Sequence, residues 1–227
     1  MPLIRLNKYL ASIGIASRRK IDAMALEHRI SLNGEIANPG DKVNPETDTV
    51  IVDQKIIKPQ PQPLVYYLLN KPKYVLSTSH DDRGRDTVIN YIPQTFRVFP
   101  VGRLDYESTG LIILTNDGDL SLRLTHPRFH LPKTYLITIL GKVSPEKINQ
   151  MNTTDAKVRK IAFKYNQTTL EVILYTGKKR QIRLMCSGLH LHLLDLHRTN
   201  IGPLAINDLP PGKYRLLTPE EINSLKN

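Results

Sequence analysis

The segment from Lys58 to Pro63, KPQPQP, constrains the fold of this 227-residue chain more than any other feature. Its three prolines occupy every second position, which favours an extended backbone with few hydrogen bonds and is typical of a linker. We therefore expect a small domain of residues 1–58, a linker of residues 59–63 and a larger domain of residues 64–227. Hydrophobic residues make up 40% of the chain, so both domains can bury a core.

The small domain is predicted to begin with two helices. Apolar residues from Leu3 to Ile13 recur at helical spacing, and Gly14 is a suitable helix stop. Ser17 is a good N-cap for a second helix over residues 18–27. Two short apolar strands are expected after the helices, at residues 30–32 and 50–52.

The larger domain is predicted to mix strands with helices. Runs of β-branched, aromatic and aliphatic residues predict strands at 65–69, 111–115, 133–140 and 169–174. Helices are expected at 87–92, 117–124, 144–150, 178–187 and 218–225. Because strands and helices do not alternate regularly, the sequence predicts an α+β fold rather than repeated βαβ units.

The charge of the chain indicates a polyanionic partner. Lys and Arg total 32 against 21 Asp and Glu, a net charge of +11, and such an excess attracts nucleic acid. The alternative is a basic protein that binds no polyanion. Residues 1–60 carry nine Lys and Arg against seven acids, whereas residues 61–227 carry 23 against 14. The basic character of the small domain is therefore local, at Arg18, Arg19 and Lys20.

The composition excludes several classes of protein. Cys186 is the only cysteine, so neither an intramolecular disulfide nor a cysteine-rich zinc site can form. The histidines lack a compact metal-ligand spacing, and no phosphate-binding loop or dinucleotide fingerprint occurs. The N-terminus lacks the long apolar core of a secretory signal, and no run approaches the roughly 18 apolar residues of a membrane span. We expect a soluble, cytoplasmic protein without a metal, a cofactor or a membrane.

Asp105 is the first candidate for chemistry. It lies in the stretch GRLDYESTGLIILTNDGDL, two residues after Arg103, and side chains two positions apart in an extended chain point to the same side. The apolar strand that follows offers a rigid scaffold on which a loop acid can be positioned. The alternative is an ordinary loop carboxylate that pairs with Arg103 or caps a turn.

The second candidate is the basic run GKKRQIR. Lys178, Lys179, Arg180 and Arg183 follow the end of a predicted strand, and cations at a helix start suit contacts with phosphate. If the run is helical, Lys179, Arg180 and Arg183 share one face. The alternative is a solvated charged face with no ligand.

The third candidate is Tyr135. It lies in the predicted strand 133–140, from which an aromatic ring can stack on a nucleobase while its hydroxyl makes a polar contact. The alternative is a tyrosine of the core or of a cross-strand pair.

Taken together, the motifs resemble a known family. LNKYLASIGIASRRK followed by ISLNGE resembles an S4 RNA-binding domain. The rest is similar to the ribosomal pseudouridine synthases of the RsuA/RluB type, through motifs that stand in the family's order: LLNKP, GRLDYESTGLIILTNDGDL, LTHPRF, KTY, GKKRQIR and IGPLAINDLPPGKYRLLTPEE. The resemblance covers nearly the whole chain. It implies a small α/β S4 domain, then a mixed, mainly antiparallel β-sheet domain with flanking helices and a central cleft.

The resemblance also implies roles for single residues. The aspartate of GRLD is the family's catalytic residue, which is Asp105 here. The family's active-site tyrosine corresponds to Tyr135, and the arginine that pairs with the aspartate corresponds to Arg183. Arg103 is similar to the residue that helps to hold the RNA duplex open when the target base leaves the stack.

Further residues are expected to bind RNA. The resemblance places Arg18, Arg19 and Lys20 at the start of the second helix of the S4 domain, which docks on RNA. Independently of the resemblance, one cation of the run Lys178, Lys179, Arg180 and Arg183 is expected to enter a cleft while the others hold backbone phosphates. Lys179 stands where the family commonly has asparagine, and Leu184 stands where it often has a second arginine. Both departures affect expected RNA contacts and leave the three chemical positions unchanged.

The implied activity is the isomerisation of a specific uridine to pseudouridine in ribosomal RNA, by base flipping and without a cofactor. The segment 77–88 and LTHPRF look more like the large-subunit enzymes, so we expect a large-subunit target and, by default, a monomer. The alternatives are a small-subunit target and a non-catalytic RNA-binding or ribosome-assembly protein on the same scaffold. A methyltransferase with an S4 domain is a further rival, but the missing glycine-rich cofactor loop counts against it.

Overall fold

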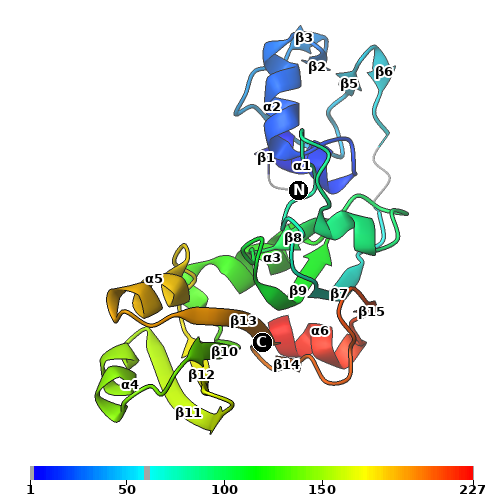
Figure 1. Ribbon diagram of the computed structural model, residues 1–227. Coiled ribbons are helices and arrows are strands. Elements are labelled where there is room, and N and C mark those ends of the chain that lie inside the picture. Colours follow the sequence, from blue (N-terminus) through cyan, green and yellow to red (C-terminus); the bar gives the residue numbers. More distant parts are fainter. Residues whose placement is uncertain (1–2, 59–61, 227) are drawn as a thin grey trace. The chain divides into compact units, whose positions relative to one another are not determined.

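The computed structural model describes residues 3–58 and 62–226, and the chain divides into two compact units (Figure 1). We call residues 1–64 the N-terminal unit and residues 65–227 the C-terminal unit. Most of the predicted linker, residues 59–61, lies outside the described residues. No helix in the part of the chain that the structure describes is both long and apolar enough to cross a membrane.

The N-terminal unit packs two helices against short strands. Its elements are β1 (Ile4–Arg5), α1 (Leu6–Ser12), α2 (Arg18–Leu26), β2 (Ile30–Leu32), β3 (Glu35–Ile36), β4 (Lys42–Val43), β5 (Val50–Val52) and β6 (Lys55–Ile56). The strands β3-β2-β5-β6 form one antiparallel sheet, and β1 pairs with β4. Leu10, Ile21 and Ile30 are fully buried in the apolar core that joins the helices to the strands.

The first helix is shorter than predicted. Leu3 is exposed, β1 pairs with β4, and the Leu6 N–H donates to the Asp41 carbonyl at 2.8 Å. The chain is therefore held extended until Leu6, where the helix begins. The second helix begins as predicted, because the Ser17 hydroxyl accepts a hydrogen bond from the Lys20 N–H at 3.2 Å.

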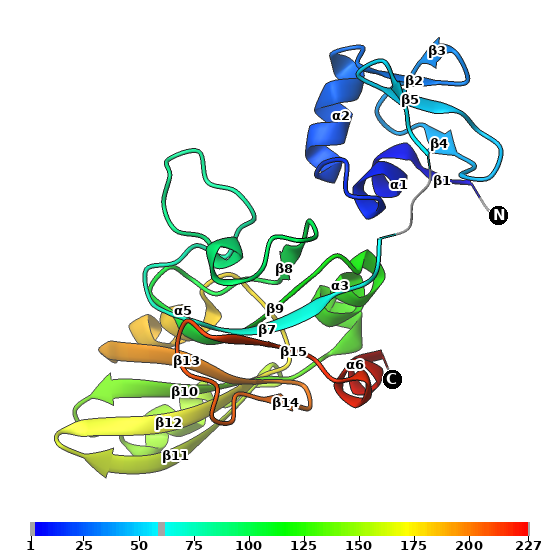
Figure 2. The ribbon, with the colours of Figure 1, turned by 90° about the vertical axis from the view of Figure 1, so that its right-hand side faces the viewer.

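A mixed sheet forms the centre of the C-terminal unit. Its strands are β7 (Tyr66–Lys71), β8 (Phe99–Val101), β9 (Thr109–Thr115), β10 (Lys133–Leu140), β11 (Ala156–Lys164), β12 (Gln167–Leu174), β13 (Leu193–Ile201), β14 (Leu204–Ala205) and β15 (Tyr214–Leu216). They run in the order β11-β12-β10-β13-β9-β7-β15, with β8 paired to β9 and β14 to β13 (Figure 2). Only β13 and β9 pair in parallel among the described strands, so the predicted mainly antiparallel α+β fold is confirmed.

Helices cover the sheet in separate places. They are α3 (Gly118–Thr125), α4 (Pro145–Met151), α5 (Gln181–Gly188) and α6 (Pro219–Lys226). α3 and α6 contact each other and share an apolar core with β7 and β9, whereas α4 and α5 pack with β10 and β12 (Figures 1 and 2). The other face of β7 and β9 is covered by a loop that includes the 3₁₀ turn Val88–Tyr91, where an α-helix was predicted.

The predicted helix 178–187 begins later than expected. Arg180 adopts a left-handed conformation with φ +55°, so the helix starts at Gln181. Lys178 and Lys179 therefore lie in a loop, and the prediction that cations of this run share a helical face with Arg183 is wrong.

Two long strands escaped prediction. β11 is an edge strand. Buried and exposed side chains alternate only over its first three residues and the rest are exposed, so its sequence lacks the alternating apolar pattern of a strand. β13 lies in the middle of the sheet but contains Asp195, His197 and Arg198. Of these polar residues Arg198 lines the cleft, whereas Asp195 pairs with Lys73 and His197 with Thr109.

Candidate active site

A cleft of about 270 Å³ opens in the C-terminal unit. Residues of β8, β9, β10 and β13 line it, together with the loop after β8 and the start of α5. All seven site residues predicted for this domain line the cleft: Arg103, Asp105, Tyr135, Lys178, Lys179, Arg180 and Arg183.

Asp105 is placed by the tight connection between β8 and β9. Leu104 next to it is buried, and its main chain is held from both sides, since the Ser77 hydroxyl donates to its carbonyl at 2.8 Å and accepts from its N–H at 3.1 Å. The Asp105 carbonyl accepts the Ser108 N–H at 3.0 Å, which closes a turn. The carboxylate is 33% exposed, so it is positioned firmly and still reachable from the cleft.

The Asp105 carboxylate is paired with Arg183. Arg183 Nε donates to Asp105 Oδ2 at 3.2 Å, and Arg183 Nη2 donates to the Ser108 hydroxyl at 3.2 Å. Arg180 Nη1 stands farther from the same oxygen, at 3.9 Å. In the described part of the chain the ion pairs of Asp105 are these two, and none joins it to Arg103. A guanidinium this close fixes the direction of the carboxylate, as a positioned nucleophile requires.

Tyr135 projects from β10 into the same cleft. Its side chain is 8% exposed, and its register partner on β13 is Arg198. The guanidinium carbon of Arg198 lies 6.0 Å from the centre of the Tyr135 ring. An aromatic ring held this way, next to a carboxylate and a guanidinium in one cleft, offers a stacking surface for a nucleobase.

Three cations near the cleft were not predicted as site residues from the sequence: Lys71 and Arg198, which are buried, and Lys133, which is partly buried. Lys71 is fully buried, and its ammonium donates to the carbonyls of Pro72 at 2.8 Å and Ser108 at 2.7 Å. Burial lowers the pKa of Lys71 to about 8. The positive charge of Arg198 lowers this pKa further, whereas the negative charge of Asp105 raises it. Burial also lowers the pKa of Lys133 to about 8, again with help from Arg198. For Lys71 the sequence did offer a signal, because a lysine that follows the apolar residues of the strand motif LLNKP indicates a buried cation.

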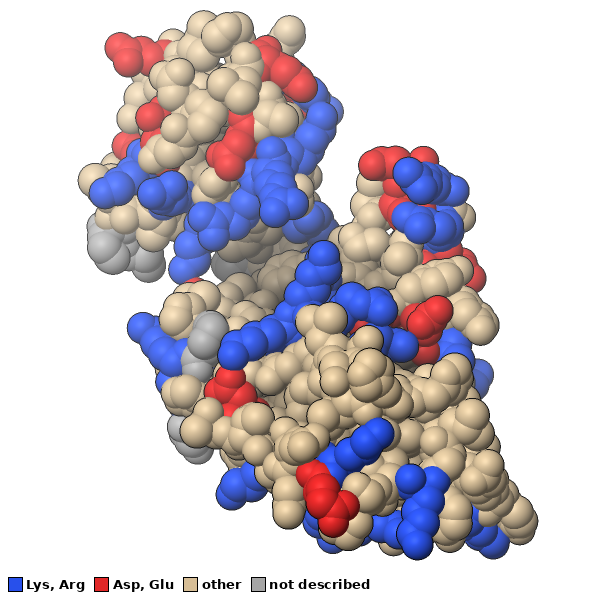
Figure 3. All heavy atoms as spheres, turned by 60° about the vertical axis from the view of Figure 1, so that its left-hand side comes forward, with Lys and Arg blue, Asp and Glu red and all other residues tan. Residues whose placement is uncertain are grey.

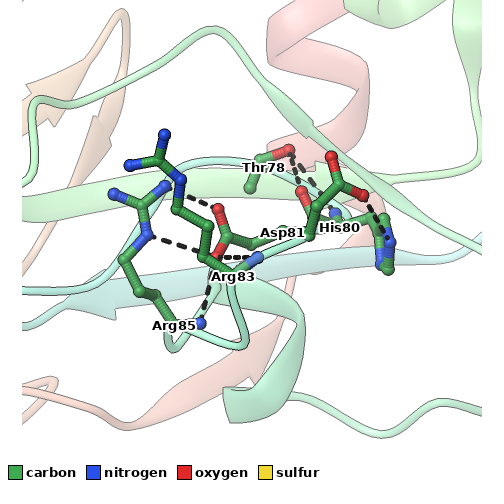
Figure 4. A network of polar contacts seen from close by, with 6 residues as sticks. Thr78, His80, Asp81, Arg83 and Arg85 are labelled. Atoms are coloured by element: carbon green, nitrogen blue, oxygen red, sulfur yellow. Dashed lines mark hydrogen bonds and ion pairs between the residues drawn. The ribbon is translucent and has the colours of Figure 1, made fainter.

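A loop beside the site holds two further arginines. Asp81 accepts the main-chain N–H of Arg83 at 3.2 Å and of Arg85 at 3.0 Å, and its carboxylate pairs with the Arg85 guanidinium at 2.7 Å. Figure 4 shows both guanidinium groups on the same side of the loop. Ser77, at the start of this loop, is hydrogen-bonded to the main chain of Leu104, which precedes Asp105.

The predicted RNA-binding residues of the N-terminal unit lie at the start of α2. Arg18, Arg19 and Lys20 are exposed, and Figure 3 shows Lys and Arg side chains gathered on this unit as well as across the face of the C-terminal unit. Arg18 Nε donates to the Asn7 side chain at 3.2 Å, and the Asn7 amide is held in turn by Asp22. The first cation is thereby given a fixed direction.

Residues 65–188 match the family described as RNA pseudouridylate synthase, and residues 4–50 match the S4 domain. The chain belongs to the RNA pseudouridylate synthase family. This synthase is accordingly an isomerase that acts on RNA, and it carries an S4 RNA-binding domain at its N-terminus.

Several relatives match the synthase over almost its whole length. It is 39% identical to an uncharacterized RNA pseudouridine synthase of Aquifex aeolicus, with 98% of this chain and 93% of the relative covered. It is 33% identical to the ribosomal large subunit pseudouridine synthase B of Bacillus subtilis (98% and 95% covered), and 36% identical to the dual-specificity RNA pseudouridine synthase RluF of Escherichia coli (98% and 78% covered). A crystal structure of a pseudouridylate synthase superposes with a TM-score of 0.68 at 26% identity, covering 98% of this chain and 99% of that one.

Proposed function

We propose that this synthase converts one specific uridine of large-subunit ribosomal RNA to pseudouridine, with Asp105 as the catalytic carboxylate. The observation that carries the proposal is the Asp105–Arg183 pair, 3.2 Å long, in the cleft that Tyr135 also lines. The large-subunit target is supported by the Bacillus subtilis relative, whose name states that substrate.

The reaction breaks the C1′–N1 bond of the uridine, turns the uracil, and joins C5 to C1′, while C5 loses a proton and N1 gains one. Nothing is oxidised or reduced, so the residues of the cleft suffice for the chemistry. The ionised carboxylate of Asp105 attacks the nucleoside or stabilises positive charge at C1′. Arg183 orients that carboxylate through its hydrogen bond, and Tyr135 stacks against the uracil.

The uridine reaches this cleft only after it leaves the RNA stack, at a cost of a few kcal/mol. Arg103 offsets part of that cost by occupying the opened duplex, and it is exposed at the edge of the cleft as this role requires. Lys178, Lys179 and Arg180 are also exposed and line the cleft, where they contact the backbone phosphates on either side of the target.

The N-terminal unit supplies a second contact with structured RNA through Arg18, Arg19 and Lys20. Their exposure at a helix start suits the recognition of shape and phosphate rather than of bases. We propose that the synthase works as a monomer, because Asp105, Tyr135 and Arg183 come together within a single chain.

The test is a map of pseudouridines in all RNA of cells with and without the gene, followed by complementation. We expect one large-subunit site to vanish in the deletion and to return with the unmutated synthase but not with Asp105→Asn. Asp208→Asn, which changes an exposed carboxylate outside the cleft, is the matched control and should restore the site. Rescue by Asp105→Asn would overturn the catalytic assignment, and a lost site in another RNA would overturn the proposed target.

A further inference from the structure

Arg198 of β13 is buried without a partner for its charge. Its side chain is 3% exposed, and Nε donates to the Leu111 carbonyl at 2.6 Å. Nη2 is buried and has no hydrogen-bond partner, nor does Arg198 form an ion pair with any described residue. Burying a guanidinium is costly unless a carboxylate or another anion compensates it. The unmatched charge therefore indicates an anionic ligand.

The fold is adapted locally to bring Arg198 to this place. Thr134 pairs with Asn200 but Tyr135 pairs with Arg198, so β13 contains one extra residue in a bulge. Bulges next to active sites redirect a side chain. On the other side Gly110 has φ +105°, and a Cβ there would collide with the Arg198 main chain. The bulge and the glycine together let the Arg198 backbone come close to β9, while Arg198 is one of the residues that line the cleft.

Arg198 belongs to the same cleft as Asp105 and Tyr135. Its guanidinium carbon lies 6.0 Å from the Tyr135 ring centre, on the side of the cleft where the uracil would stack. The charge of Arg198 also contributes to the lowered pKa values of Lys71 and Lys133. A ligand with negative charge would relieve this repulsion.

We propose that Arg198 is a further catalytic residue, whose guanidinium binds a carbonyl oxygen of the uracil and stabilises the negative charge that develops on the base. This rests on the proposed function, specifically on the placement of the target uridine beside Asp105 and Tyr135.

The chemistry of the reaction requires such a group. When the C1′–N1 bond breaks, its electron pair stays on the base and spreads from N1 to O2 and O4. C5 then supplies an electron pair for the new bond to C1′ and loses its proton to water or to a basic group, while N1 takes up a proton, so atoms and electrons balance. Attack of the Asp105 carboxylate on the base would also drive an electron pair onto O4. A fixed cation in a site with little water stabilises this charge in either route.

Backbone phosphate is the competing ligand, and the geometry disfavours it. Arg103 and the run Lys178–Arg180 are exposed at the edge of the cleft, where a phosphodiester can reach them. Arg198 is 3% exposed and lies against Tyr135, so a phosphate would have to replace the base in the cleft to contact it.

The first test measures turnover and affinity separately. The substrate is an RNA fragment that carries the mapped uridine labelled with tritium at C5, whose release reports formation of the new bond. We expect Arg198→Met to lower the single-turnover rate roughly 100- to 1000-fold and to change the Kd for RNA less than about threefold. Arg215→Met, the control, removes a partly buried arginine that pairs with Glu221 outside the cleft, and its rate should stay near that of the unmutated synthase.

The second test probes the contact with the base itself. Replacing O2 or O4 of the target by sulfur weakens the acceptor, so the sulfur effect on the rate at one of these positions should be much larger in the unmutated synthase than in Arg198→Met. Equal effects in both proteins would overturn the proposal. If Arg198→Met does not fold, Arg198→Lys is compared in the same way, since it keeps a cation but loses the planar fork.

The remaining outcomes separate this inference from the proposed function. An unchanged rate in Arg198→Met would show that Arg198 makes no contact with the reacting base and would overturn the proposal. A raised Kd with a weaker salt dependence would show a phosphate contact instead and would also overturn it. If Asp105→Asn retains activity while Arg198→Met loses it with the expected sulfur effects, the catalytic assignment of Asp105 fails and that of Arg198 stands.

Discussion

The starts of α2 and α5 both carry a run of cations, yet the two regions are built differently. In α2 the Ser17 hydroxyl caps the helix, so Arg18, Arg19 and Lys20 lie in a regular first turn and are exposed. In α5 the residue before the helix, Arg180, is left-handed and provides no side-chain cap.

This difference changes where the charge goes. Ahead of α5, Lys178, Lys179 and Arg180 remain exposed in a loop, while Arg183 in the first helical turn is only 17% exposed and pairs with Asp105. Every cation of the α2 run faces solvent, which suits docking on phosphate. A basic run therefore indicates RNA contact in both places, but only the second region sends one cation inward to a carboxylate.

Arg183→Met should have the largest effect of the substitutions that test this contrast. Asp105 loses a guanidinium 3.2 Å away and Ser108 loses its donor, so we expect the single-turnover rate to fall roughly 100- to 1000-fold at similar RNA affinity. Arg180→Met is the matched variant, because Arg180 is half exposed and 3.9 Å from the same oxygen, and its rate should fall less than about tenfold. If both variants lost the same factor in rate, the buried Arg183 and the exposed Arg180 would not differ in their roles, and the contrast would fail.

The buried cations of the C-terminal unit also predict how stability depends on pH. The pKa of Lys71 is lowered to about 8 in the folded protein, whereas an exposed lysine in the unfolded chain titrates near 10.4. Between these values the unfolded chain binds more protons, so raising the pH from 8 towards 10 increases the free energy of unfolding, on the order of 1–2 kcal/mol. Below pH 8 both states are protonated and the full cost of burial remains.

The measurement is urea unfolding between pH 7 and 9.5, below the range in which most tyrosines ionise. The difference between the unmutated synthase and Lys71→Met isolates the lysine. A difference that does not change with pH would show that Lys71 is not buried as a strained cation. Lys20→Met, which removes an exposed cation of α2, is the control.

The residues of the site that lie in contiguous motifs could be predicted from the sequence. The residue that depends on pairing between strands far apart in the chain could not. The strand and helix patterns around Asp105, Tyr135 and Arg183 placed these residues in a loop before a strand, within a strand and within a helix, and the structure brings them into one cleft. Arg198 lacked such a signal. It is buried because β13 lies between β10 and β9, strands that come well before it in the chain, and no local pattern encodes that arrangement.

Removing the α2 run should weaken RNA binding without affecting chemistry. Changing Arg18, Arg19 and Lys20 together to Ala eliminates up to three phosphate contacts, so affinity for structured RNA should fall on the order of tenfold, with a shallower dependence on salt. The rate on a short fragment that carries only the target should be unchanged. An equal loss on fragment and structured RNA would contradict the separation of docking from catalysis.

The smallest expected effect concerns the caps themselves. Ser17→Ala removes the acceptor for the Lys20 N–H and should lower the stability of the N-terminal unit by about 1 kcal/mol. Arg180→Gly should have the opposite sign in the C-terminal unit, because glycine adopts φ +55° without the steric cost that arginine meets there, a gain of up to about 1 kcal/mol. Thermal unfolding of each variant measures both signs. If Arg180→Gly lowers the stability, the contacts of the Arg180 side chain stabilise the C-terminal unit by more than its left-handed backbone costs. The Arg180 side chain would then be what stabilises the irregular start of α5.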